Sequence, residues 1–157
     1  MFDSNRRFQT LMSVATLAVL ALASMSGGAQ ADTTLDLSEY DGKVVVLDFW
    51  ASWCVPCRRS FPWMNDMQKK YGDEGLVIIG VNMDADAGEA SEFLNDYPAD
   101  FKIIYDPDGD LAREYDVIAM PSSYVIGRDG ERVTRHLGFK VKQQDEYEAL
   151  LMEELGK

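Results

Sequence analysis

The sequence predicts an α/β domain in which buried strands alternate with amphipathic helices. Short apolar runs bounded by glycine and proline recur along the chain, and between them apolar residues are spaced by three and four. This alternation is typical of a mostly parallel sheet that is covered by helices on both faces. A chain of 157 residues provides enough sequence for one such domain.

The charge balance disfavours several classes of function. The chain has 15 Lys and Arg against 27 Asp and Glu, which gives a formal net charge of −12. Nucleic-acid binding depends on clustered Lys and Arg, so we expect no nucleic-acid partner. Docking on an anionic membrane surface is disfavoured for the same reason. Two cysteines and one histidine cannot fill the usual four-ligand zinc site, so no metal is expected.

The first 31 residues have the pattern of a secretory signal peptide. An arginine pair at positions 6–7 precedes an uncharged apolar segment, and Ala29-Gln30-Ala31 fits the small-x-small rule for cleavage. We expect residues 1–31 to be removed and residues 32–157 to form the domain. The alternative is an uncleaved anchor over residues 11–25, although the strongly apolar core is shorter than the roughly 20 residues that usually span a bilayer.

The first predicted elements surround one buried strand. Val44–Trp50 is a continuous apolar run whose single charge is Asp48, as expected for a strand covered on both faces. Cys54–Tyr71 has apolar residues spaced by three and four, which predicts a helix. After a glycine-bounded turn, Leu76–Met83 is predicted to be a second buried strand. The acidic stretch 84–92 is expected to be a solvated surface.

The second half continues the alternation and ends in a helix. Pro98, Asp-Gly turns and single glycines separate its elements. The predicted elements are a helix over Gly88–Tyr97, a strand over Phe101–Tyr105, a short helix over Asp110–Asp116, a strand over Ser122–Ile126, its hairpin partner over Glu131–Gly138 and a terminal helix over Gln143–Leu155. The hairpin adds an antiparallel edge to the sheet.

Cys54 and Cys57 carry the strongest functional signal in the chain. They are separated by Val55 and Pro56 at the junction of a strand and a helix, which is typical of a redox motif. The N-terminus of a helix has unsatisfied N–H groups and a positive dipole end, which stabilise a thiolate on Cys54. Two alternatives stay open from the residues alone: an inert structural disulfide, and a thiolate pair that transfers a metal ion.

Asp48 is an ionisable group in the middle of an apolar strand. Burial favours the neutral carboxyl, so we expect the pKa of Asp48 to be raised, which suits an acid–base role. The alternative is a satisfied structural group. The single histidine, His136, is expected to be a surface or packing residue away from the cysteines. Trp50, Tyr124 and Phe139 are expected to belong to the core.

Several segments resemble the thioredoxin superfamily. Val44–Cys57 is similar to its active-site strand and helix start, and Leu37–Lys43 together with Phe61–Met64 resembles the periplasmic TlpA/ResA-like thiol-disulfide oxidoreductases. Ile118–Ile126 resembles the family's cis-proline loop and following strand, and residues 84–105 resemble its inserted helix and strand. The resemblance covers essentially the whole domain. It implies a thioredoxin-like fold: a central mixed sheet with helices on both faces and an inserted helix–strand element.

The resemblance also implies roles for individual residues. Cys54 would be the nucleophile and Cys57 the resolving cysteine, with Asp48 helping to deprotonate Cys57. The bond between Met120 and Pro121 would be cis, in a loop that faces the cysteines. The residues expected to contact substrate are Trp53, Pro56, Met120 and Pro121. Ser60 departs from the pattern, because ResA-like proteins that reduce apocytochrome c often carry Glu there; a role in cytochrome c maturation therefore stays open.

We therefore predict a monomeric periplasmic protein-disulfide reductase with no bound cofactor. Its expected partners are disulfide-bearing proteins and a membrane thiol-electron donor. Val55-Pro56 carries no charge that would stabilise a thiolate. We therefore expect a reduction potential nearer the ~−270 mV of thioredoxin than the ~−120 mV of a strong oxidant. The alternative is a binding module that delivers copper or holds thiol proteins without turnover.

Overall fold

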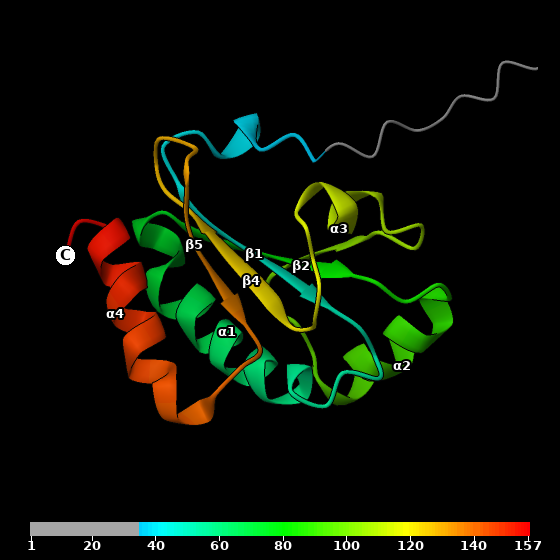
Figure 1. The fold of residues 1–157 in the computed structure, drawn as a ribbon. Coiled ribbons are helices and arrows are strands. Elements are labelled where there is room, and N and C mark those ends of the chain that lie inside the picture. Colours follow the sequence, from blue (N-terminus) through cyan, green and yellow to red (C-terminus); the bar gives the residue numbers. More distant parts are fainter. Residues whose placement is uncertain (1–34) are drawn as a thin grey trace, which may run out of the picture. The chain divides into compact units, whose positions relative to one another are not determined.

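The computed structural model describes residues 35–157, which form a five-stranded mixed sheet with helices on both faces (Figure 1). The strand order is β3-β2-β1-β4-β5. β1, β2 and β3 are parallel, whereas β4 runs antiparallel to β1 and β5 antiparallel to β4. The mixed sheet and the antiparallel hairpin at its edge are therefore confirmed. The expected leader over residues 1–31, and its anchor alternative over 11–25, lie outside the described residues.

The elements follow the predicted order with small shifts at their ends. They are β1 Val44–Trp50, α1 Cys57–Tyr71, β2 Leu76–Asn82, α2 Ala87–Asp96, β3 Lys102–Tyr105, α3 Asp110–Glu114, β4 Ser122–Ile126, β5 Arg132–Leu137 and α4 Gln144–Glu154. Between residues 35 and 157, no helix is long and apolar enough to cross a membrane.

β1 lies at the centre of the sheet, and all seven of its residues are buried. Its side chains alternate between two hydrophobic clusters, because successive residues of a strand point to opposite faces. Val44, Val46 and Trp50 pack with α1, α2 and α4, whereas Val45 and Phe49 pack with α3 on the other face. A strand that is covered in this way needs apolar residues at nearly every position, and the sequence supplies them.

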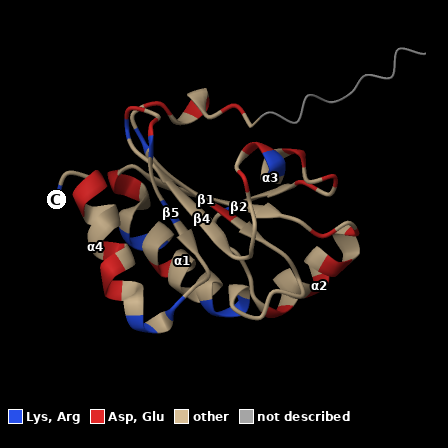
Figure 2. Ribbon diagram, in the orientation of Figure 1, with Lys and Arg blue, Asp and Glu red and all other residues tan. Residues whose placement is uncertain are grey.

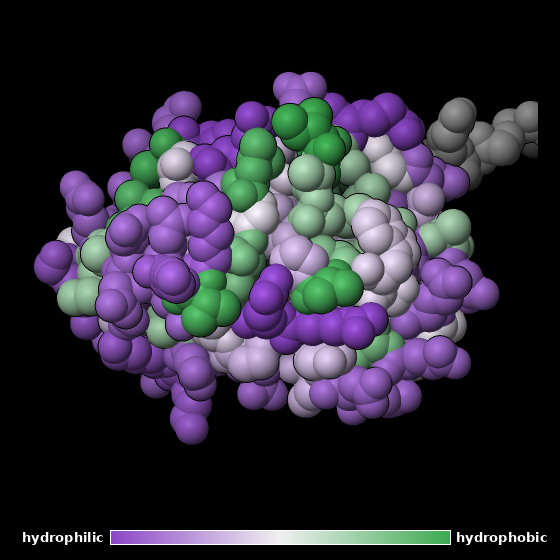
Figure 3. Space-filling model, turned by 60° about the horizontal axis from the view of Figure 1, so that its bottom comes forward, coloured by the Kyte–Doolittle hydropathy of each residue, from purple (hydrophilic) through white to green (hydrophobic). Residues whose placement is uncertain are grey.

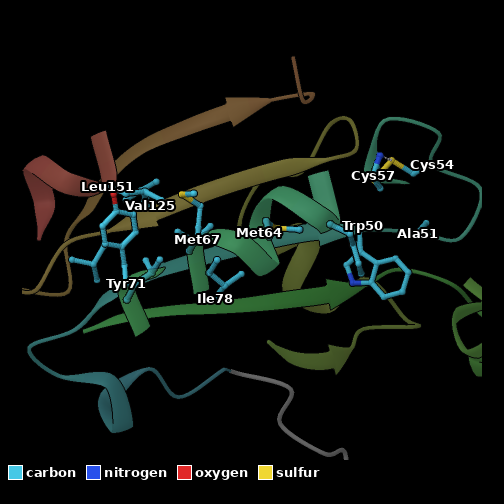
Figure 4. Close-up of a cluster of buried hydrophobic side chains, with 14 of the residues drawn as sticks. Trp50, Ala51, Cys54, Cys57, Met64, Met67, Tyr71, Ile78, Val125 and Leu151 are labelled. Atoms are coloured by element: carbon cyan, nitrogen blue, oxygen red, sulfur yellow. Dashed lines mark hydrogen bonds between the residues drawn. A yellow bond between two sulfur atoms is a disulfide. The ribbon is translucent and has the colours of Figure 1, made fainter. Parts of the chain in front are cut away.

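The inserted helix and strand are tied to the larger cluster by aromatic contacts. Phe93 of α2 and Phe61 of α1 both pack against Trp50, with ring centroids 4.8 and 4.9 Å away. Phe101, just before β3, lies 5.3 Å from Phe61. The disulfide lies at one end of this cluster and Tyr71 at the other (Figure 4). The core therefore supports the paired cysteines directly.

The predicted start of the first long helix was wrong by three residues. α1 begins at Cys57, and Pro56 is its N-cap. Cys54 lies in the preceding turn, where its N–H donates to the Ala51 carbonyl at 3.0 Å. Pro56 has no N–H, and the Cys57 N–H donates to the Cys54 carbonyl at 3.1 Å across a turn, so the first helical backbone bond is that from the Ser60 N–H to the Pro56 carbonyl at 3.2 Å.

Candidate active site

The paired cysteines form a disulfide at the junction of β1 and α1. The two Cα atoms lie 5.3 Å apart. Cys54 is 3% exposed and Cys57 is fully buried, yet the neighbouring Trp53 and Val55 are exposed by 64% and 59%. The sulfur atoms therefore lie at the edge of the core, beside two apolar side chains that a partner protein can contact.

The N-terminus of α1 is directed at the Cys54 sulfur, although Cys54 is outside the helix. The backbone N–H of Cys57 donates to Cys54 Sγ at 3.3 Å. An amide at a helix N-terminus favours negative charge on its acceptor. The local geometry therefore stabilises a Cys54 thiolate when the disulfide is reduced.

A buried carboxylate, Asp84, holds the loop that precedes the cysteines. Its oxygens accept hydrogen bonds from the backbone N–H and the hydroxyl of Ser52, at 2.9 Å each for the shortest contacts. Asn82 at the end of β2 donates to it as well, at 2.7 Å. Asp84 is only 3% exposed, so the expectation of a solvated surface was wrong at this residue.

The position of Asp84 just after β2 is the sequence signal that could have predicted its burial beside the loop before the cysteines. The carboxyl ends of parallel strands meet at one edge of a sheet, so polar residues after β2 lie close to the loop after β1. The other acidic residues of the stretch, Asp86, Glu89 and Glu92, are exposed as expected. Acidic residues are also visible on α2 in Figure 2.

Asp48 is fully buried in the middle of β1. Ser123 of β4, its partner in the sheet register, donates a hydroxyl hydrogen bond to Oδ1. Burial raises the pKa of Asp48 from 3.8 to about 7, and the Ser123 hydrogen bond offsets this shift in part. The raised pKa agrees with the sequence-based expectation. It places the proton equilibrium of Asp48 in the range where thiols exchange protons with a base.

The loop before β4 contains the cis peptide bond that the resemblance implied, between Met120 and Pro121. Pro121 is buried, and its carbonyl accepts a hydrogen bond from the Gly138 N–H at 2.8 Å. Met120 is partly buried and packs against the cluster that contains Cys54 and Cys57. Met120 and the two cysteines therefore contribute to the same hydrophobic cluster.

His136 has the packing role that the sequence predicts. The residue lies in β5 and pairs with Ser123, which in turn pairs with Asp48. Its ring packs on Tyr147 of α4 with centroids 4.8 Å apart, so it is a packing residue as expected. It also lines a small cavity together with Asp48 and Ser60, and the wall of that cavity includes neither cysteine. The register of β1, β4 and β5 brings His136 to the same face of the sheet as Asp48.

The described residues offer little for a metal ion. Between positions 35 and 157, no group of three or more His, Cys, Asp and Glu side chains is arranged to hold one. The chemistry that the site supports directly is that of two neighbouring thiols, and a buried acid, Asp48, lies on the strand that leads to them. Fold and site together define the class of this protein as a thioredoxin-fold protein with one dithiol–disulfide pair.

Comparison with known proteins agrees with this class. The family model described as Redoxin matches residues 18–151. Thiol-disulfide oxidoreductase ResA of Bacillus thuringiensis subsp. konkukian is 33% identical over 114 residues, which are 72% of this chain and 66% of the relative. ResA of Bacillus subtilis is 32% identical over 99 residues, 63% of this chain and 55% of the relative. The chain thus spans less than two thirds of the length of these curated relatives.

Solved structures show the same relationship. A candidate thiol:disulfide interchange protein DsbE from Chlorobium tepidum is 46% identical, with a TM-score of 0.75 over 78% of this chain and 86% of that one. StoA from Bacillus subtilis is 25% identical, with a TM-score of 0.59 over 69% and 84% of the two chains. The chain belongs to the Redoxin family of the thioredoxin superfamily and is similar to its ResA-like members.

Proposed function

We propose that the protein is a thiol-disulfide oxidoreductase that reduces disulfide bonds in other proteins. The observation that carries the proposal is the Cys54–Cys57 disulfide with the first amide of α1 directed at Cys54 Sγ. The names of the ResA and DsbE relatives support the same chemistry. Export to the periplasm is part of the proposal and is supported by the signal-like pattern of residues 1–31.

The reaction begins from the dithiol form of the protein. The Cys54 thiolate attacks one sulfur of a substrate disulfide, and a mixed disulfide forms while the other substrate sulfur leaves as a thiolate. Cys57 then loses its proton to the Asp48 carboxylate and attacks Cys54 Sγ. The second substrate sulfur leaves and takes up a proton. Two electrons have passed to the substrate, and the protein is left with its own disulfide.

A substrate surface is proposed around the exposed side chains near the disulfide. Trp53 and Val55 project beside the sulfur atoms, and Ile118 is exposed by 74% in the loop before Pro121. The face of the molecule in Figure 3 carries small hydrophobic patches among mostly hydrophilic side chains. Together with Pro56 and Met120, these residues suit an unfolded or extended segment that carries apolar side chains around a disulfide.

The reducing direction rests on the residues between the cysteines. Val55 and Pro56 add no charge that would stabilise a thiolate, and an ionised Asp48 would oppose one. This reasoning predicts that the reduction potential of the Cys54–Cys57 couple lies near the ~−270 mV of thioredoxin rather than the ~−120 mV of a strong oxidant. Regeneration of the dithiol then requires a thiol donor, for which we propose a membrane protein.

The cysteine variants test the proposal. Cys54→Ser should abolish the acceleration that this protein gives to the reduction of insulin by dithiothreitol. Cys57→Ser should accumulate a mixed disulfide with insulin, visible as a shift in mass that reductant reverses. If Cys54→Ser accumulated the mixed disulfide instead, Cys57 would be the nucleophile and Cys54 the resolving cysteine. Full activity of both variants would contradict the proposed function. A redox titration with glutathione or dithiothreitol tests the direction, since a potential near that of the strong oxidant would contradict a reductase.

A further inference from the structure

Three polar side chains form one row across the sheet. Asp48 of β1 pairs with Ser123 of β4, and Ser123 pairs with His136 of β5. Residues that pair directly across strands point to the same face, and their Cα atoms lie about 5 Å apart. Asp48 and His136 are therefore about 10 Å apart along one face, with Ser123 between them.

A small cavity lies against this row, between the sheet and helices α1 and α4. Its volume is about 30 Å³, and Asp48, Ser123 and His136 are part of its wall. α1 contributes Ser60, one helical turn after Cys57, whose carbonyl accepts a hydrogen bond from the Ser60 hydroxyl at 3.1 Å. The cavity thus reaches from Ser60 of α1, which is hydrogen-bonded to the Cys57 carbonyl, to the edge strand β5.

Two buried side-chain atoms of residues in this cavity wall have no hydrogen-bond partner. They are Asp48 Oδ2 and His136 Nε2. Buried polar atoms in folded proteins nearly always have a partner, often an ordered water. The cavity volume exceeds the roughly 10–15 Å³ that one water molecule requires. The cavity is therefore large enough for one or two water molecules, and in its mostly apolar wall the two residues with unpartnered atoms are candidates to hold them.

We propose that water in this cavity connects Asp48 Oδ2 to His136 Nε2, and that Asp48 exchanges its proton with solvent through His136. The proposal rests on the function proposed above, in which Asp48 takes the proton of Cys57. His136 acts through Asp48 and is a positioning residue in this scheme.

The proton balance of the route is simple. Asp48 becomes neutral when it receives the Cys57 proton. The bridging water then takes this proton from Asp48 and passes one of its own to His136 Nε2, which yields a carboxylate and an imidazolium. The imidazolium releases a proton from Nδ1, since Nδ1 is not among the enclosed atoms and the residue is partly exposed. Asp48 is thereby returned to the ionised form that the next cycle needs.

The remaining groups around the cavity do not provide a competing route. Tyr147 of α4 is the other titratable side chain in the wall, and its ring packs on His136. α1 contributes Ser60, Trp63 and Met64, none of which titrates. Burial lowers the pKa of His136, so its ring is neutral and able to accept a proton at neutral pH.

The first test uses the fact that the chain contains a single histidine. Its imidazole resonances are therefore unambiguous in an NMR titration of the oxidised protein. We expect two transitions, one from His136 itself and one near pH 7 from Asp48. In Asp48→Asn the second transition should disappear. A single transition that is the same in both proteins would overturn the link, whatever the enzymatic activity.

The second test follows the two thiol steps separately. The reduced protein reacts with dithiobis(nitrobenzoate), and the first thiolate released reports attack by Cys54, whereas the second reports attack by Cys57 on the mixed disulfide. His136→Gln should slow the second release several-fold around pH 7 and leave the first unchanged. The matched control is Arg135→Gln, which removes a charge from the neighbouring position of β5 and should change neither step.

The outcomes separate this inference from the proposed function. Wild-type rates for both steps in His136→Gln across the range around pH 7 would overturn the relay and leave the oxidoreductase standing. Absence of the first release in the wild-type protein would instead remove the proposed function. An equal slowing of both releases in His136→Gln would indicate a general loss of structure and would also contradict the specific role of His136.

Discussion

Replacing Asp48 by Asn should change how the stability of this protein depends on pH. In the native state burial raises the pKa of Asp48 from 3.8 to about 7, whereas in the unfolded chain it titrates as an ordinary aspartate. Between pH 3.8 and about 7 the native state holds a proton that the unfolded state has released. The free energy of unfolding contributed by this group therefore falls as the pH rises through that window, and it is constant above it.

The size of the effect follows from the pKa shift. One pKa unit corresponds to about 1.4 kcal/mol, so the difference between 3.8 and about 7 amounts to roughly 4 kcal/mol of lost stability above neutral pH. Asn has nearly the same shape, accepts the Ser123 hydrogen bond and cannot ionise. The variant should therefore lack this loss, and its advantage over the wild type should grow with pH by that amount.

Urea unfolding of the oxidised proteins at a series of pH values measures this difference. Asp66→Asn is a matched control, because Asp66 is an exposed residue on α1. Its stability should follow the wild-type curve with pH. The comparison uses the slope with pH, so a constant cost of burying the Asn amide does not affect it. A stability difference between wild type and Asp48→Asn that stays the same from acid to alkaline pH would refute the reasoning.

Three further substitutions test other parts of the site. Asp84→Ala should destabilise the protein by about 1–3 kcal/mol, because the part-buried N–H of Ser52 and the buried amide of Asn82 lose their acceptor; thermal unfolding measures this, and an unchanged midpoint would contradict it. Phe61→Ala should cost about 3–5 kcal/mol, since the ring is fully buried against three aromatic rings; urea unfolding checks it. Trp53→Ala should change stability by less than about 0.5 kcal/mol, because the side chain is exposed. It should slow reduction of insulin more than reaction with dithiobis(nitrobenzoate), and equal slowing of both would argue against a role in substrate contact.

Much of the fold could be predicted because its signals are local. The run Val44–Trp50 is apolar at almost every position, which only a strand covered on both faces requires. The spacing of Phe61, Met64, Met67 and Tyr71 matches the buried face of α1. Two cysteines three positions apart at a strand–helix junction are typical of a redox-active pair. Each of these inferences depends on residues that are neighbours in the sequence.

The chemistry of the site depended on contacts that no local pattern contains. The row of Asp48, Ser123 and His136 exists because β4 pairs with β1 and β5 with β4 in one particular register. A shift of one residue would turn His136 to the other face, and the sequence around His136 does not indicate which face it takes. The same holds for Asp84, whose burial against Ser52 comes from the meeting of two strand ends 32 residues apart. The sequence by itself determined the elements and the redox pair, and the tertiary structure decided which polar groups surround them, because burial and register are properties of segments that pack together only in the folded chain.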